Sequence, residues 1–487
     1  MISWNGPKEF GRFGTTPYVS KEGPRMNRTR TNFRVVVAVV TALVGLASGW
    51  ATGGDEVSLV PAERVGDSSK VSIELKAEGK YLPGLPASET EKGIAAPATP
   101  VKALALKVEL QLEFSDKVLE TAKTGQATRS ARRVQRAGTA INGDLRPTSA
   151  TVRPEVSLLL ADLRADRGLV VFSPGGPLTR SELELLQGPG DPLTLASLLP
   201  GRAVKVGDEW NLGNDLAKAV SGYDALATNA LVAKLESADS GTAKVSIRGD
   251  VRGAVLGGEG AMKIAGSFTF DRQAGRIDSL DLSRDEKRKP GRIEAGLDVQ
   301  STLKMIRKAA QAPPELADSI LSTLSLDLKP ERELLLFRPP GDKFSLVHDR
   351  DWHLAVETDR VSVLKRLDRG GDLVAQCNLS LGPNLGKGKH QDPKRFRDDI
   401  RRALGERFVQ FLSEGEVEGA PGGGYRYKVS VQGREGNVGV LWYYYLVASP
   451  AGDHLLATFT LGQAQEKTFG DQDLQLIGSL EWSAPKP

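Results

Sequence analysis

The chain has 487 residues, 40% of them hydrophobic and 26% charged, a composition that excludes an intrinsically disordered protein and exceeds what one ordinary core accommodates. The net charge of +4 arises in residues 1–34, where seven basic and two acidic side chains give +5 and leave the remaining chain at −1. A nearly neutral body argues against nucleic-acid binding, which requires a basic surface.

The basic head leads into an uncharged stretch, residues 35–51, which predicts an export signal with small residues at its end. Its 17 residues would also span a bilayer, so an uncleaved N-terminal membrane anchor is the alternative. Both interpretations place the rest of the chain outside the cytoplasm, in the periplasm or beyond the cell. We therefore treat residues 1–51 as a leader or anchor.

Residues 52–105 contain one stretch typical of a strand, VSIELKAEGKYL, and then a turn-rich segment. From residue 106 to 330 apolar and polar residues mostly alternate, as Val245 and Ile247 do, which is the period of a half-buried strand. Two such runs around a short turn predict a hairpin at residues 266–282. We expect residues 106–330 to form a curved antiparallel sheet or half-barrel with short helices.

Two short helices are predicted within this β-rich domain. Thr179 with Glu182 three residues later is the reciprocal capping arrangement of a helix start. Asp191 followed by Pro192 predicts the start of a second helix.

The adjacent acids Asp208 and Glu209 lie beside Trp210 in the stretch LLPGRAVKVGDEWNL. A catalytic pair would need burial or a close like charge to raise a carboxyl pKa. Gly207 and Asp208 are turn-forming residues, so we expect a solvated turn between two strands instead.

Residues 331–487 are predicted to form a second domain of strands and one long helix. The helix is capped by Asp392, and one apolar stripe predicts that it runs through the following five residues: Phe396, Ile400, Leu404, Phe408 and Phe411. The single cysteine, Cys377, excludes an intramolecular disulfide and is expected to be a buried strand residue.

Residues 333–484 resemble the PsbP/Mog1-like α/β fold of exported bacterial proteins, on the segments FSL…W, AQCNLS, GGGYRYKV, LLATFTL and FGDQDLQLIGSLEW. The resemblance implies a module that binds proteins as an assembly or accessory factor, and it transfers no catalytic residue. The β-rich domain, with its phrase VKVGDEW, is similar to curved-sheet carriers of the bacterial envelope, which implies a hydrophobic ligand. Together these features predict an α+β fold class.

Two polar clusters are candidate sites. The run Arg129, Arg132, Arg133 and Arg136 is expected to be a solvated face, with an anion site as the alternative. In a strand, the motif HDRDWH would place Asp349, Asp351 and His353 on one face, a set that could bind a metal ion. We prefer ordinary surface pairing with the neighbouring arginine.

The aromatic run LWYYYL, residues 441–446, is the strongest apolar signal after the leader. Alternation sends aromatic side chains to both faces, which favours a central strand covered on both sides. The alternative is an aromatic groove for a partner, so the candidate interaction surface is Trp442, Tyr443, Tyr444 and Tyr445.

All four histidines lie after residue 347, and we find no nucleophile, zinc or nucleotide motif. The sequence therefore predicts a non-enzymatic exported envelope protein that acts by binding a protein or envelope component, or by structural support. We expect no cofactor, metal or nucleic acid, and no buried cluster of converging ionisable groups. The alternatives are a carrier of a hydrophobic ligand in the β-rich domain and a hydrolase that uses two carboxylates.

Overall fold

The computed structural model describes residues 56–83, 102–145, 147–291, 293–368, 370–418 and 424–483. The predicted leader, residues 1–51, lies outside these ranges. Strands hold 53% and helices 16% of the described residues, so the protein is mostly β and the predicted α+β class is wrong. The predicted class rested on the α/β resemblance of the second domain, but most α-helices in the described residues have only four to eight residues.

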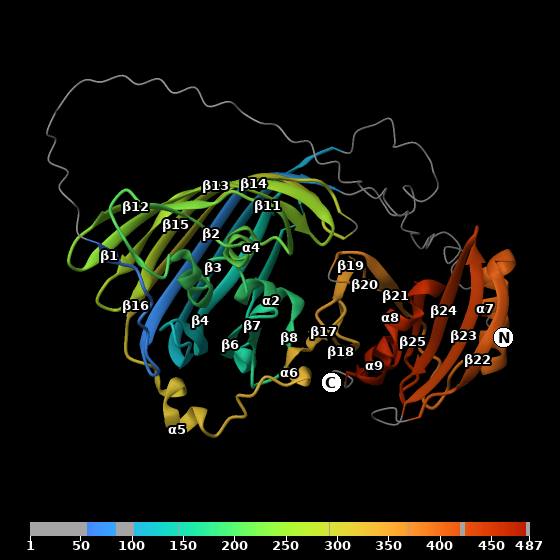
Figure 1. Cartoon of the computed structure of the whole chain (residues 1–487). Helices are drawn as coiled ribbons and strands as arrows, with labels where there is room; N and C mark the ends of the chain where they lie inside the picture. The colour runs from blue at the N-terminus through green and yellow to red at the C-terminus, as the bar shows by residue number, and fades with distance from the viewer. Residues whose placement is uncertain are drawn as a thin grey trace, which may run out of the picture.

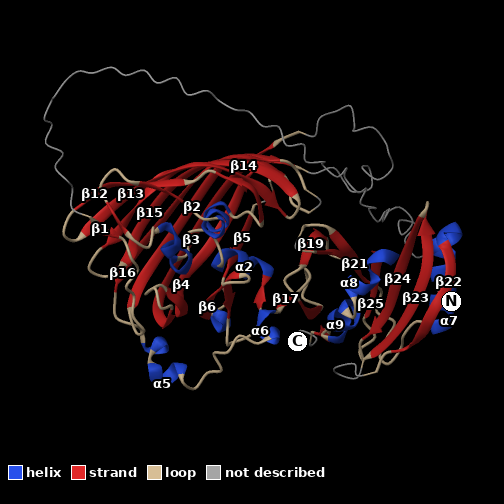
Figure 2. Cartoon of the chain, viewed as in Figure 1, coloured by secondary structure: helices blue, strands red, loops and turns tan. Residues whose placement is uncertain are grey.

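The larger sheet has thirteen strands, all paired antiparallel, and it arches over one side of the molecule (Figures 1 and 2). Its main path is β10 (Glu209–Asn211), β12 (Val232–Ala238), β13 (Thr242–Val255), β14 (Gly258–Asp271), β15 (Arg276–Arg288), β16 (Gly296–Ala309), β2 (Ser68–Leu82), β3 (Leu104–Thr121), β4 (Ala127–Gly143), β6 (Leu158–Arg164) and β7 (Gly168–Phe172). Beside this path, β11 (Ala225–Asn229) pairs with β13 and β5 (Thr148–Thr151) with β4. The predicted hairpin is confirmed as β14 and β15.

Short helices fill the concave side of this sheet (Figure 2). They are α2 (Arg180–Leu186), α3 (Pro192–Leu195), η3 (Ala196–Leu198) and α4 (Asn214–Ser221). Both predicted caps are confirmed: Thr179 and Glu182 form a reciprocal capping box, and Asp191 accepts a bond from the backbone of Leu193. Apolar side chains from these helices and from the inward face of the sheet form one core.

The second sheet has seven strands in the order β19 (Trp352–Glu357), β20 (Val361–Leu367), β21 (Leu373–Leu381), β25 (His454–Gly462), β24 (Val438–Ala448), β23 (Tyr425–Glu435) and β22 (Phe408–Glu416). Helix α7 (Pro393–Leu404) packs on one face, and α8 (Glu466–Phe469) and α9 (Gln472–Gly478) pack on the other. This arrangement gives the sheet two separate cores.

The helix predicted to run through Phe411 ends earlier. Asp392 caps it as expected, but Gly405 has a φ of 55° and the chain then enters strand β22 at Phe408. Phe408 and Phe411 still pack against the α7 core, although from the sheet. Their spacing fitted a helical stripe, which is why the sequence prediction was wrong there.

A small four-stranded sheet joins the two large ones. It runs β26 (Glu481–Trp482), β18 (Phe344–His348), β17 (Leu335–Phe337) and β8 (Leu178–Thr179), and β8 belongs to the helical layer under the first sheet. The remaining elements are β1 (Val57–Ser58), β9 (Ala203–Val204), η2 (Pro154–Val156), η4 (Pro314–Leu316), α5 (Asp318–Leu321), α6 (Pro330–Glu333), η5 (Gly405–Arg407) and η7 (Gln463–Gln465). Within the described ranges, no helix has the length and apolarity needed to cross a bilayer.

Candidate functional site

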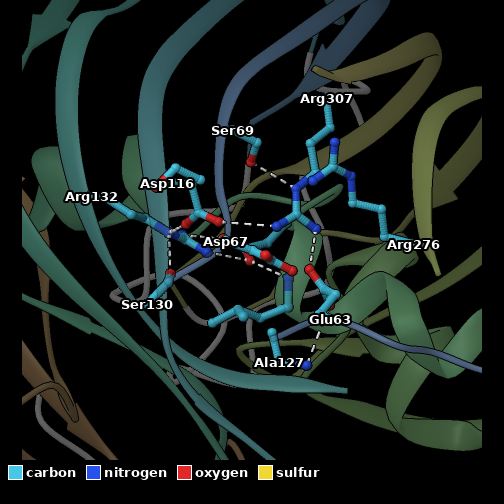
Figure 3. Close-up of polar contacts among 12 residues, drawn as sticks. Glu63, Asp67, Ser69, Asp116, Ala127, Ser130, Arg132, Arg276 and Arg307 are labelled. Atoms are coloured by element: carbon cyan, nitrogen blue, oxygen red, sulfur yellow. Dashed lines mark hydrogen bonds and ion pairs between the residues drawn. The ribbon is translucent and has the colours of Figure 1, made fainter. Parts of the chain in front are cut away.

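A network of buried charges lies between the larger sheet and its helices (Figure 3). It contains Glu63, Asp116, Arg132, Asp191 and Arg307, whose side chains are at most 5% exposed. Arg132 donates bonds of 2.5 and 2.8 Å to Asp191 and one of 3.1 Å to Asp116. Arg307 donates to Glu63 at 2.6 Å and to Asp116 at 3.3 Å, so Asp116 bridges the two arginines.

The network contradicts the expectation that no buried ionisable groups converge, and Arg132 is not on a solvated face. Burial lowers the pKa of Arg132, but the charges and hydrogen bonds of Asp191 and Asp116 outweigh it and hold the pKa above its ordinary value. Asp191 also caps α3, while Arg132 and Arg307 lie on β4 and β16. The network therefore links helix α3 to strands β4 and β16, which are distant from it in the sequence.

Two small cavities lie beside the concave face. One, about 10 Å³, lies between apolar side chains of β2, β3 and β16 and the end of α2. The other, also about 10 Å³, is lined by Glu63, Arg276 and Arg307. A single water requires roughly 10–15 Å³, whereas ligand pockets are usually about 300–1,000 Å³. Neither of these two cavities is large enough for a hydrophobic ligand.

A second polar cluster at the far end of β15 is less well paired. Tyr223 is 2% exposed, and its hydroxyl has no hydrogen-bond partner among the described residues. The same holds for Glu286 Oε1 and Arg288 Nε, which lie 3.6 Å apart. Burial raises the pKa of Glu286 above its ordinary 4.5, because charge is costly there and Arg288 and Arg284 offset it only in part.

The motif HDRDWH forms a turn rather than the predicted strand. Residues 349–351 connect β18 to β19, and Asp349 and Asp351 both bond Arg366, at 2.9 and 3.2 Å. His353 is half-buried, and burial, with the charge of Arg180, lowers its pKa to about 4. The described residues contain no group of three or more acidic, His or Cys side chains placed to hold a metal ion.

The aromatic run lies on β24, an interior strand of the smaller sheet. Trp442 and Tyr445 are buried in the cores on opposite faces, and Tyr443 and Tyr444 are partly buried. Tyr445 donates a 2.6 Å bond to Asp473, which also accepts a 2.5 Å bond from Lys428. This placement favours a packing role for Trp442 and Tyr445, and leaves the aromatic interaction surface a prediction.

The remaining candidate residues lie in ordinary structural positions. Asp208 lies in the turn before β10 and accepts a bond from the backbone of Lys205, while Glu209 pairs with Arg248 at 2.8 Å on the surface. The predicted turn is confirmed. Cys377 is fully buried in β21 as predicted, and burial raises the pKa of its thiol.

The last strand of the larger sheet, β7, has a sealed edge. Gln187 donates a 2.6 Å bond to the carbonyl of Leu169, and Arg350 donates a 2.7 Å bond to the carbonyl of Val171. Arg350 also bonds the side chain of Gln187 at 3.3 Å and the carbonyl of Glu333 at 3.0 Å. The arginine of HDRDWH thus closes the sheet edge, because it occupies carbonyls that another strand could bond.

The last strand of the smaller sheet, β22, has an open edge. Among the described residues, no strand pairs with its outer side. Val409 and Leu412 are 49% and 47% exposed, and both lie at register irregularities, where they have no partner on β23. Val409 and Leu412 are the two exposed apolar side chains of this strand, and we call them the β22 patch. Phe408 and Phe411 instead pack on the α7 core.

The β22 patch is the candidate site that sequence reasoning missed. A signal was present in the sequence, because Gly405 can end a helix and the following FVQFL is rich in residues that favour strands. The helix prediction placed Phe408 and Phe411 on the inward face and gave no role to Val409 and Leu412. The patch differs from scattered exposed apolar residues, which need no explanation, because its members adjoin on one unpaired strand.

No family model and no curated protein matches the chain. Among solved structures, it is similar to a Bacteroides thetaiotaomicron protein at 14% identity, over 31% of this chain and 48% of that chain, with a TM-score of 0.23. The chain therefore spans about half the length of that structure. A Pseudomonas aeruginosa protein of unknown function matches at 14% identity over 32% of this chain and 99% of its own, with a TM-score of 0.21.

The cyanobacterial PsbP of a Synechocystis species matches at 10% identity over 31% of this chain and 93% of its own, with a TM-score of 0.23. PsbP is therefore among the structural neighbours, as the sequence resemblance implied, but the likeness is weak. None of the three matches carries an argument about fold or activity.

Proposed function

We propose that the chain is a non-enzymatic, exported protein of the cell envelope that binds another protein through the β22 patch. The observation that carries the proposal is the contrast between edges: the long β-rich sheet ends in a sealed strand, whereas β22 stays open with Val409 and Leu412 exposed. Open apolar edges are association sites, and proteins normally protect them. Export rests on the sequence of residues 1–51.

The chemistry of the buried network also supports binding over hydrolysis. A carboxylate-dependent hydrolase needs two accessible acids about 5–9 Å apart, one of them able to release a proton. Asp116, Asp191 and Glu63 are each bonded to an arginine and enclosed. A carrier would need a ligand cavity, and those beside the concave face are of water size.

Photo-crosslinking from within the patch tests the proposal. Replacing Leu412 with p-benzoylphenylalanine in the full chain, in the cells that produce it, is expected to give a covalent adduct with a protein. Val356 is the matched control, because it is equally exposed, at 49%, on the opposite edge strand of the same sheet. Absence of a protein adduct specific to position 412 would contradict the proposal.

A further inference from the structure

We infer that the larger sheet has a peptide-binding groove on its outward face, which in the single chain is occupied by the linker, residues 313–328. The ligand of this groove is an extended segment of another protein that has spaced leucines and acidic side chains. The groove does not involve the β22 patch, so this inference goes beyond the proposed function and does not depend on it.

The floor of the groove is an apolar cluster on the face of the sheet opposite to the helices. Side chains alternate along β4, so Arg132 points toward the helical layer, where it bonds Asp191, while Ala131 faces outward. Leu160 of β6 and Phe172 of β7 are fully buried in the same outward cluster as Ala131. The linker shields these side chains from water, because its leucines pack on them.

The linker places leucines on this floor at intervals. It contributes Leu316, Leu321, Leu326 and Leu328, of which the first two are buried and the other two partly buried. The first three are five residues apart. Between these anchors the linker faces solvent, as at Ile320, which is 45% exposed. Spaced anchor side chains of this kind are how peptides bind grooves on other proteins.

Basic side chains of the sheet bind the polar groups of the linker. Lys117 on β3 has a side chain that is only 10% exposed, and its ammonium donates to the carbonyl of Leu316 at 3.0 Å and to Asp318 at 2.8 Å. Arg133 on β4 lies 3.4 Å from Glu315. Two acids of the linker therefore meet two cations of the sheet, and this complementarity is the reason for assigning an acidic ligand.

Arg129 on β4 binds the other end of the linker, but one of its donors is unused. It donates to the carbonyl of Leu326 and, at 2.9 Å, to the carboxylate of Glu120. Its Nε is buried and has no hydrogen-bond partner among the described residues. The linker therefore satisfies the groove incompletely. A segment that placed a carboxylate at this Nε would bind better, because hydrogen bonds between charged groups are stronger.

The contacts of the linker suit a segment that can be displaced. Figure 1 shows the linker in yellow, running from β16 through α5 to α6. Residues 313–328 contain only η4 and α5 and form no strand with any described part of the sheet, so no hydrogen-bonded ladder holds them. Because the linker is covalently joined to β16 and α6, its effective concentration at the groove is on the order of millimolar. A free segment therefore binds well only when it makes better contacts or when the linker is weakened.

A synthetic peptide of residues 313–328 is the probe for the groove. In fluorescence anisotropy with the labelled peptide, the full chain carrying Leu316→Ser and Leu321→Ser is expected to bind about tenfold or more tightly than the parent chain, whose own linker competes. Adding Lys117→Ala to this weakened chain should remove most of the gain. Ile320→Ser is the matched control, because its side chain is exposed, and it should bind the peptide as the parent chain does.

Asp318→Lys provides a second test that leaves the apolar contacts intact, because this side chain is 93% exposed. It places a cation beside Lys117 and should raise the affinity for the peptide about threefold. If the leucine variant does not fold, the Asp318→Lys chain decides alone. The inference is overturned if no folded weakened chain binds the peptide more tightly than the parent chain does. It is also overturned if a peptide with serine at positions 316 and 321 binds as well as the parental peptide.

Discussion

The two large sheets end differently, although both end in an edge strand that could recruit another chain. Strand β7 has its outer carbonyls occupied by Gln187 and Arg350, the second of which comes from the other half of the molecule. Strand β22 has no such cover among the described residues, and Val409 and Leu412 project beside it. Side chains therefore cover the outer carbonyls of β7, whereas the outer side of β22 has no such cover among the described residues.

This difference distinguishes residues that stabilise the fold from residues that are available to bind a partner. Where polar groups are buried, the protein pairs them and thereby holds its elements together, as in the network around Asp116. Where apolar groups are exposed on β22, they stabilise the fold little and remain available to a partner.

The largest effect on stability is expected in the buried charge network beside the larger sheet. Arg132→Ala leaves Asp116 and Asp191 buried without their shared cation, which should lower the free energy of unfolding by about 3–5 kcal/mol. Arg133→Ala, next along β4 but 32% exposed, should cost less than about 1 kcal/mol. Urea unfolding of both variants measures the difference, and equal losses would show that the network is not structural.

Opening the sealed edge should have the next largest effect. Arg350→Ala removes the bonds to the carbonyls of Val171 and Glu333, for an expected loss of about 1.5–3 kcal/mol. The uncovered β7 edge should also promote oligomers larger than those of the parent chain. Urea unfolding and light scattering would report these changes, and an unchanged variant would mean that the seal is incidental.

In the poorly paired cluster of Tyr223, Glu286 and Arg288, we expect a smaller effect on stability that depends on pH. Because the folded pKa of Glu286 is raised, its favourable contribution is complete below pH 4.5 and is lost as the pH rises through the folded pKa. Glu286→Gln should therefore be more stable than the parent chain at pH 7, with the gain disappearing below pH 4.5.

Tyr223→Phe is the control for this pH dependence. It removes the unpaired hydroxyl and should stabilise the protein by about 1 kcal/mol at both pH values. Thermal unfolding at pH 4 and pH 7 distinguishes the two variants. A Glu286→Gln gain independent of pH would contradict the burial argument.

The smallest effect on stability is expected at the open edge. Leu412→Ser should change the free energy of unfolding by no more than about 0.5 kcal/mol, because the side chain is already half-exposed. It should nevertheless weaken the recovery of the bound protein in a pull-down with the full chain. A large loss of stability would show that the patch serves the fold instead.

Local features were readable from the sequence because their physics is local. The caps at Thr179 and Asp191, the hairpin of β14 and β15, and the turn at Asp208 each depend on a few adjacent residues. The end of α7 was misplaced because apolar spacing alone does not distinguish a helical stripe from a helix followed by a strand.

The buried network could not be assembled from local patterns, since Glu63 and Arg307 are 244 positions apart. One signal was available. In β3, Asp116 follows Leu112 and Phe114 at alternate positions, and in β16 Arg307 follows Met305 in the same way. A charged residue in inward register predicts a buried partner, although the pattern cannot identify that partner.

Amide hydrogen exchange of the full chain tests the contrast between the edges most directly. We predict that residues 408–416 of β22 exchange faster than residues 168–172 of β7. Exchange in β22 that is as slow as in β7, or slower, would contradict this contrast.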